Sequence, residues 1–149
     1  ARICCRISNI LLPYQNGAKC LIWSHTYIDS PSKLTLVNNL SINRYCILHA
    51  GVEIEIVNDL LIGPNVTIYS QNHNYTDSAT PIYKQGYTCK KVQIGNNVWI
   101  AANATILPGV TIGDNAVIGA NTLVNKNIEK GTLVAGNPCR VIKKIGEND

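Results

Sequence analysis

Residues 94–129 read IGNNVW IAANAT ILPGVT IGDNAV IGANTL VNKNIE when they are divided into groups of six. An aliphatic residue opens every hexad, and a small or β-branched residue stands at every fifth position. An amphipathic helix repeats its apolar residues every 3.6 positions, and a two-sided strand repeats them at every second position. A strict period of six predicts instead a short strand and a turn, repeated on the three sides of a triangular prism.

The same pattern occurs upstream in longer coils. Residues 36–42 (LVNNLSI) resemble residues 56–62 (IVNDLLI) at an offset of 20, whereas Ile94 and Ile112 are 18 residues apart. Ile56 precedes Ile94 by 38 residues, so this coil carries about 20 additional residues. They are polar and rich in turn formers, and they predict a loop that projects from the prism at about residues 69–93. We place the repeats at about residues 28–145 and expect residues 1–149 to form a single domain.

The composition agrees with short strands joined by tight turns. The chain contains 20 Ile, 11 Val and 18 Asn but no Phe or Met, and only 15% of its residues are charged. β-Branched residues favour strands, and Asn favours turns.

The basic residues that give the net charge of +4 are scattered and do not alternate with aromatic residues, so we expect no nucleic-acid partner. Because no run approaches 18 apolar residues, we expect no transmembrane segment.

The six cysteines form neither a CxxC pair nor a Cys/His spacing typical of zinc sites. We therefore expect no metal, and we expect reduced thiols that act as small hydrophobic residues. The N-terminal residues do not show the charged lead, apolar stretch and cleavage site of a signal peptide. A cytoplasmic protein is expected.

The six hexads and the closing segment VAGNPCRVI at residues 134–142 resemble the hexapeptide-repeat acyltransferases. The resemblance implies an all-β fold, a left-handed parallel β-helix with a projecting loop and a short C-terminal segment. It points to the branch that contains the maltose, galactoside, serine and virginiamycin-type acetyltransferases and the sugar O-acetyltransferases of polysaccharide biosynthesis. It also implies a homotrimer, because this family places its active sites in the clefts between three prisms.

His73 lies at the base of the expected loop, in the segment QNHNYTD of residues 71–77. The resemblance implies that it is the catalytic general base, since imidazole titrates near neutral pH and can accept a hydroxyl proton. No GxSxG or Ser/His/Asp motif indicates a covalent acyl-enzyme. We therefore expect the acceptor to attack the thioester of acetyl-CoA directly, with a backbone amide stabilising the oxyanion. The alternative for His73 is an ordinary surface histidine.

The resemblance also implies a binding site for acetyl-CoA. Trp99 would line the channel for the thioester and the pantetheine, and the backbone of Ala102 and Ala120 would contact the cofactor arm. Lys126 and Arg140 match basic positions of relatives, where cations would bind the phosphates of coenzyme A. Packing at a subunit interface is the alternative for Trp99, and ordinary solvated charge is the alternative for the two cations.

Two further residues are candidates for binding the acceptor. Asn43 matches, by its spacing from His73, a residue that contacts the sugar in galactoside-type relatives, and His49 on the next hexad would face the same cleft. A structural turn residue and a packed histidine are the respective alternatives. Tyr75 and Asp77 would shape the acceptor end of the site.

Together these features predict an acetyl-CoA-dependent O-acetyltransferase that modifies a sugar, in surface polysaccharide or lipopolysaccharide biosynthesis. The alternatives are acetylation of another small molecule (a free sugar, serine or an antibiotic), N-acetylation of an amino sugar, or a β-helix scaffold without catalysis. A γ-type carbonic anhydrase uses the same prism and three histidines. Here His25, His49 and His73 are spaced by 24 residues, which is not a multiple of the 18-residue coil.

Overall fold

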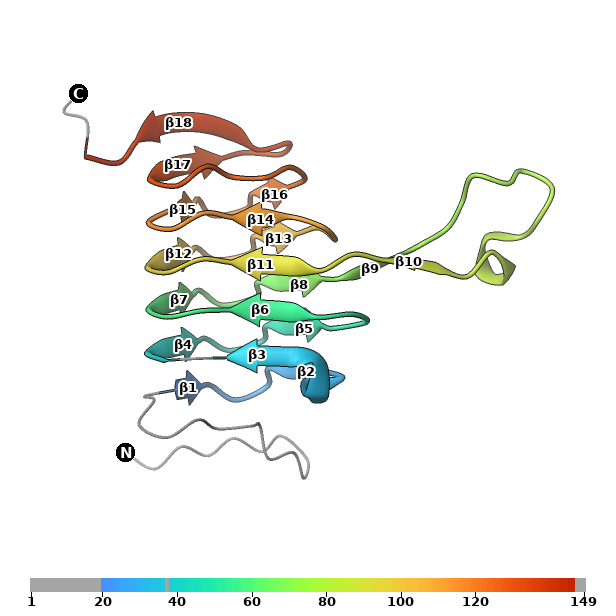
Figure 1. The fold of residues 1–149 in the computed structure, drawn as a ribbon, viewed down its shortest axis with the longest axis horizontal. Helices are drawn as coiled ribbons and strands as arrows, with labels where there is room; N and C mark the ends of the chain where they lie inside the picture. Colours follow the sequence, from blue (N-terminus) through green and yellow to red (C-terminus); the bar gives the residue numbers. More distant parts are fainter. Residues whose placement is uncertain (1–19, 37, 147–149) are drawn as a thin grey trace.

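A computed structural model of the chain describes residues 20–36 and 38–146, and these residues form a solenoid of about six turns (Figure 1). Nearly every element is a short strand. Two single-turn 3-10 helices, η1 (Pro31–Lys33) and η2 (Ile82–Lys84), lie outside the sheets. Within the described residues, no helix is long and apolar enough to cross a membrane.

Three sheets form the three faces of the solenoid. The first face contains, in spatial order, β1 (Cys20–Ile22), β4 (Leu40–Ile42), β7 (Leu60–Ile62), β12 (Val98–Ile100), β15 (Val117–Ile118), β17 (Thr132–Ala135) and β18 (Arg140–Lys144). The second face contains β2 (Tyr27–Asp29), β5 (Ile47–His49), β8 (Thr67–Tyr69), β13 (Thr105–Ile106) and β16 (Leu123–Val124). The third face contains β3 (Leu34–Leu36), β6 (Ile54–Ile56), β11 (Val92–Ile94) and β14 (Thr111–Ile112).

Apart from the antiparallel β18, the strands of the three faces pair in parallel with the equivalent strands of neighbouring coils. On the first face, for example, Ile100 lies in register between Ile62 and Ile118. The first and fifth residues of all six hexads in residues 94–129 point inward, and none of them is more than 5% exposed. The hexad pattern therefore builds one continuous column of stacked aliphatic side chains, as the sequence predicts.

The corners of the prism turn through left-handed backbone conformations. At the corner between the third and first faces, Asn97 and Asn115 have φ angles of 53° and 57°, a region that Asn tolerates better than most residues. Asn97 Nδ2 donates a hydrogen bond of 2.8 Å to Asn115 Oδ1. At the preceding corner position, Asn58 Nδ2 donates to Asn96 Oδ1 at 2.9 Å. The surplus of Asn in the chain is thus explained by stacked side chains at the corners.

The additional residues of the longest coil form a β-hairpin that projects from the corner between the second and third faces (Figure 1). In it, β9 (Gln71–His73) pairs with β10 (Tyr87–Cys89) in antiparallel register, and η2 lies between the two strands. The projecting loop predicted from the sequence is therefore present and has regular structure at its base.

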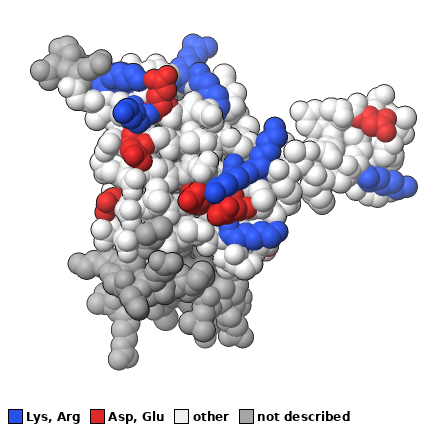
Figure 2. Space-filling view, in the orientation of Figure 1, with Lys and Arg blue, Asp and Glu red and all other residues white. Residues whose placement is uncertain are grey.

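The C-terminal end of the solenoid is covered by β18, which pairs with β17 in antiparallel register. Lys144 Nζ lies 2.6 Å from Glu129 Oε2 and fixes β18 to the coil below. The hydrogen bond and the positive charge of Lys144 lower the pKa of Glu129. Charged side chains are otherwise sparse, and most of the face seen in Figure 2 is uncharged.

The cysteines of the described region are free thiols: Cys20, Cys46, Cys89 and Cys139. Cys46 and Cys139 are buried, as expected for small hydrophobic residues, and burial raises the pKa of the Cys46 thiol. Cys89 on β10 differs from that expectation because it is exposed. Cys4, Cys5 and the segment inspected for a signal peptide lie outside the described residues.

Candidate active site

A pocket of about 320 Å³ lies at the base of the projecting hairpin. Both strands of the hairpin contribute to it, together with the corner between the second and third faces in two successive coils. The lining residues are Asn72, His73, Asn74, Tyr75, Thr76, Thr88, Lys90, Leu107, Pro108 and Asn125. The lining combines hydroxyl and amide groups with one imidazole and one ammonium group, and it contains no acidic residue. Such a pocket suits a small polar molecule.

His73 is the last residue of β9 and lies opposite Tyr87 of β10. The two ring centroids are 4.4 Å apart, so the tyrosine ring restricts the orientation of the imidazole. The backbone N–H of His73 donates to Asn72 Oδ1 at 3.0 Å. Within the described part of the chain neither imidazole nitrogen has a hydrogen-bond partner. The ring is therefore held in place while both nitrogens remain available to a molecule in the pocket.

Gln85 organises the outer part of the hairpin. Its Nε2 donates to the carbonyl oxygens of Asp77 at 2.8 Å and Thr80 at 2.7 Å, and its Oε1 accepts the N–H of Asp77 at 3.2 Å. The carbonyl oxygen of Gln85 accepts Asn74 Nδ2 at 2.9 Å. A single side chain thus satisfies polar groups of the loop that would otherwise depend on water. The sequence pattern did not single out Gln85 for this role, because a hydrogen-bonding Gln inside an aperiodic loop carries no positional signal.

The structure separates the two residues that were expected to shape the acceptor end. Tyr75 lines the pocket of His73, whereas Asp77 does not. The hydroxyl of Thr80 and the N–H of Ala79 hold the pKa of Asp77 below its usual range, and Asp77 Oδ1 accepts the Ala79 N–H at 2.9 Å. The Asp77 carboxylate therefore stabilises the turn of the loop.

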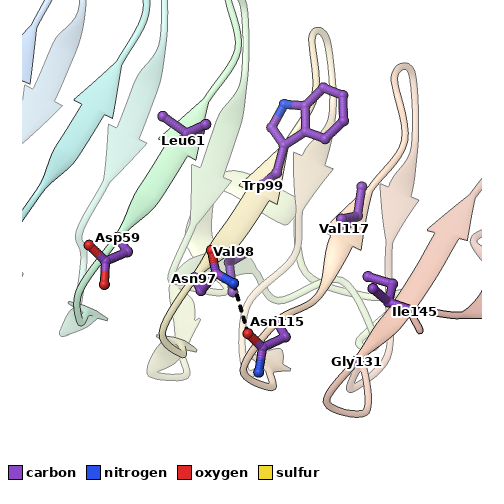
Figure 3. A pocket seen from close by; sticks show the side chains of 9 residues that line it. All are labelled: Asp59, Leu61, Asn97, Val98, Trp99, Asn115, Val117, Gly131 and Ile145. Atoms are coloured by element: carbon purple, nitrogen blue, oxygen red, sulfur yellow. Dashed lines mark hydrogen bonds between the residues drawn. The ribbon is translucent and has the colours of Figure 1, made fainter.

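Trp99 lies on a different part of the solenoid. It projects from β12 on the first face, is 52% exposed, and is flanked in register by Leu61 and Val117. These three side chains line a second pocket, of about 440 Å³, in which Asn97 donates to Asn115 (Figure 3). The two pockets have no lining residue in common. One chain by itself therefore does not bring Trp99 to His73.

Ala102 and Ala120 occupy the corner between the first and second faces, one coil apart. The carbonyl of Ala102 accepts the N–H of Asn121 at 2.9 Å. Neither the N–H of Ala102 nor the N–H and carbonyl of Ala120 has a partner among the described residues. Arg140, at the start of β18, lies near the same corner through its pairing with Ala135, and its side chain is exposed. This corner therefore presents backbone groups without a hydrogen-bond partner in the described region, together with one positively charged side chain.

Lys126 is exposed and follows Asn125, which lines the pocket of His73. The structure therefore places Lys126 beside the pocket of His73 and apart from Trp99 and Arg140. In residues 20–36 and 38–146 its ammonium group has no ion-pair partner. The cations predicted to bind one cofactor thus lie at two different corners of the prism.

Asn43 and His49 line neither pocket. Asn43 Oδ1 accepts the N–H of Arg44 at 2.8 Å, and the Asn43 carbonyl accepts the hydroxyl of Thr26 at 2.8 Å, so this residue stabilises its corner. His49 Nε2 lies 3.2 Å from Asp29 Oδ2 on the second face. Its buried Nδ1 has no hydrogen-bond partner in the described part of the structure. A role of either residue in acceptor binding stays a prediction.

The three histidines lie at three separate places. His25 occupies a corner between the first and second faces with its ring stacked on Tyr45 at 5.2 Å, His49 is on β5, and His73 is on the hairpin. Among the residues that the structure describes, no group of three His, Cys, Asp or Glu side chains is arranged to hold a metal ion.

Comparison with known proteins agrees with this architecture. Residues 91–126 match the family model for bacterial transferase hexapeptide (six repeats). The chain is 42% identical over 135 residues to the galactoside O-acetyltransferase of Lactococcus lactis, over 89% of this chain and 64% of that protein. It is similar to the crystal structure of a maltose O-acetyltransferase from Clostridium difficile, with a TM-score of 0.79 and 39% identity over 85% of this chain and 66% of that one.

A hexapeptide-repeat acetyltransferase from Vibrio cholerae, solved in complex with acetyl coenzyme A, is also similar. Its TM-score is 0.80 at 28% identity, and the match covers 87% of this chain and 70% of that one. The predicted all-β, left-handed parallel β-helix is confirmed by these similarities. The chain spans less than two thirds of the length of the curated relatives it matches first.

Proposed function

The chain belongs to the hexapeptide-repeat acetyltransferase family, and on this premise we propose that it transfers an acetyl group from acetyl-CoA to a hydroxyl group of a sugar. The observation that carries the proposal is the pocket at the base of the hairpin, where neither imidazole nitrogen of His73 has a hydrogen-bond partner among the described residues. Galactoside and maltose O-acetyltransferases among the relatives support a sugar as acceptor.

The proposed reaction uses His73 as the general base. The proton of the acceptor hydroxyl passes to the imidazole while the hydroxyl oxygen forms a bond to the acetyl carbon. The carbon–sulfur bond then breaks, and His73 returns the proton to the departing thiolate of coenzyme A. The products are an acetyl ester and the free thiol, so His73 ends the cycle in its starting state. Open backbone N–H groups along the solenoid are suited to stabilise the intermediate oxyanion.

Acetyl-CoA is proposed to bind along the edge formed by Trp99, Ala102, Ala120 and Arg140. Trp99, Leu61 and Val117 form an apolar part of their pocket that suits the pantetheine. The N–H groups of Ala102 and Ala120 and the carbonyl of Ala120, which have no partner among the described residues, are suited to bond its amides. Arg140 is suited to the phosphates, because charge-assisted hydrogen bonds to phosphate are strong. The structure of the Vibrio cholerae relative with acetyl coenzyme A supports this choice of cosubstrate.

The active unit is proposed to be a homotrimer. In one chain the pocket of His73 and the pocket of Trp99 lie on different parts of the solenoid. A cyclic trimer can bring the hairpin of one subunit to the first face of its neighbour. Lys126, beside the hairpin, would then reach a coenzyme A molecule bound to the neighbour's Trp99 face. Exposed Leu61 and Trp99 would be covered at this contact.

Mixing two inactive variants tests the shared site. We expect His73→Ala and Trp99→Ala trimers each to have low activity at subsaturating acetyl-CoA. When the two are unfolded, mixed and refolded together, about one quarter of the sites should combine an intact His73 with an intact Trp99 of the neighbour, as random assembly of a cyclic trimer requires. The measurement is the initial rate of thiol release. Mixed samples no faster than the mean of the two variants would show that each site lies within one subunit.

The biological setting is part of the same proposal. We propose that the residues 1–149 act as one catalytic domain and that the acceptor is a sugar of surface polysaccharide or lipopolysaccharide biosynthesis. The free thiols of the described region are typical of a reducing compartment, which supports a reaction in the cytoplasm.

The direct test of this function is acetyl transfer in vitro. The purified chain should release free thiol from acetyl-CoA only when a sugar acceptor such as a methyl galactoside is present. Mass spectrometry should show the sugar heavier by one acetyl group. An ester-forming reaction distinguishes this activity from N-acetylation, because mild alkali removes only the ester. If a panel of sugars gives no acceptor-dependent thiol release, the proposed function is wrong.

A further inference from the structure

Lys90 is a basic residue that lines the pocket containing His73. Its backbone N–H donates to the carbonyl of Ser70 at 2.8 Å, which fixes the point where the hairpin returns to the solenoid. Its aliphatic stem covers the backbone of Gly109 so closely that a β-carbon on Gly109 would lie 3.1 Å from Lys90 Cδ. The stem of the side chain is therefore packed along the adjacent coil, and Lys90 is the one basic residue of the pocket lining.

The ammonium group of Lys90 is not neutralised by the part of the chain that the structure describes. The next residue, Lys91, behaves differently: its Nζ lies 3.2 Å from Glu53 Oε2 and 2.7 Å from Glu55 Oε2. Lys90 has no such ion pair, and no acidic side chain lines its pocket. The local charge is therefore positive, and it favours an anion.

From this geometry we infer that the acceptor carries a negatively charged group, a phosphate or a carboxylate, and that Lys90 binds this group. The inference rests on the proposed function, because it assumes that the pocket of His73 holds the hydroxyl that reacts. The phosphates of acetyl-CoA are separated from the thioester by the whole pantetheine arm. An anion that shares a pocket of about 320 Å³ with the reacting hydroxyl therefore belongs to the acceptor.

The experiment compares methyl galactoside, galactose 1-phosphate and galacturonate as acceptors for the full chain. We expect kcat/KM to be about tenfold higher for the two anionic sugars, the effect of one charge-assisted hydrogen bond. Lys90→Ala should raise KM for the anionic sugars about tenfold and leave KM for the methyl galactoside and for acetyl-CoA unchanged. Lys84→Ala is the matched control, since Lys84 is an exposed lysine of the same hairpin that does not line the pocket.

Binding of galactose 1-phosphate, measured by calorimetry without acetyl-CoA, separates this inference from the proposed function. If galactose 1-phosphate binds in a Lys90-dependent manner but no sugar is acetylated, the anion site is supported and the proposed function is overturned. Efficient transfer to the neutral galactoside, with no preference for the anionic sugars, would support the function and overturn the inference. Weaker binding of coenzyme A to Lys90→Ala, with acceptor binding unchanged, would assign the anion to the cosubstrate and also overturn it.

Discussion

Replacement of His73 by alanine is expected to lower kcat by roughly 10²–10⁴-fold, the usual contribution of a general base. The imidazole lines the pocket, is held against Tyr87 and keeps both nitrogens free of hydrogen bonds within the described region. Without it, no other side chain of the pocket lining can accept a proton readily at neutral pH, because the remaining side chains are amides, hydroxyls, one lysine and the apolar Leu107 and Pro108. Steady-state thiol release at saturating acetyl-CoA measures the effect.

The dissociation constant of coenzyme A distinguishes catalysis from binding. It should stay nearly unchanged in His73→Ala, because Trp99 and the corner alanines, which we propose as the cosubstrate site, lie elsewhere. His25→Ala is the matched control: it removes a histidine whose ring stacks on Tyr45 far from the hairpin in sequence, and its kcat should equal that of the unaltered chain. A His73→Ala variant that turns over normally, or that loses coenzyme A binding, would contradict the role of His73 as the base.

The fold could be predicted from the sequence because the hexads are strictly periodic. Every inward position is constrained twice, by the triangular cross-section and by the coils above and below, so that Ile94, Ile100 and Ile106 are buried in equivalent places. The same periodicity located the inserted residues, since they interrupt it. A core that is built from repeated coils therefore produces a period that can be recognised in the sequence.

The arrangement of the site could not be predicted in the same way. The hairpin has no period, so its sequence did not reveal that Gln85 holds Asp77 and Thr80 or that Lys90 lies against Gly109. The sequence also did not show that His73 and Trp99 occupy separate pockets of one chain. Such contacts depend on the corner of the prism from which the hairpin projects and on which outward-facing side chains have no hydrogen-bond or ion-pair partner. Both are properties of the folded solenoid and cannot be recognised in the order of residues.

The core provides the second large effect. Ile106→Ala is expected to lower the free energy of unfolding by about 2–5 kcal/mol, the range measured when a large buried aliphatic side chain is truncated. Ile106 is fully buried on β13 and lies in register between Ile68 and Val124. Chemical denaturation followed by circular dichroism measures the change, at one protein concentration for all samples because association also contributes to stability.

Ile106 is an informative position because the β-helix resists collapse around a cavity. Parallel ladders on both sides fix β13 at the spacing of its neighbours, so the coils cannot move together to fill the space that the missing atoms leave. Thr105→Ala is the control on the same strand: its side chain points away from the core, and its loss should change stability by less than about 1 kcal/mol. Equal losses from the two substitutions would mean that the inward column of aliphatic side chains does not dominate the stability of the solenoid. A much larger loss at Ile106 would show that the hexad pattern stabilises this fold through its inward residues.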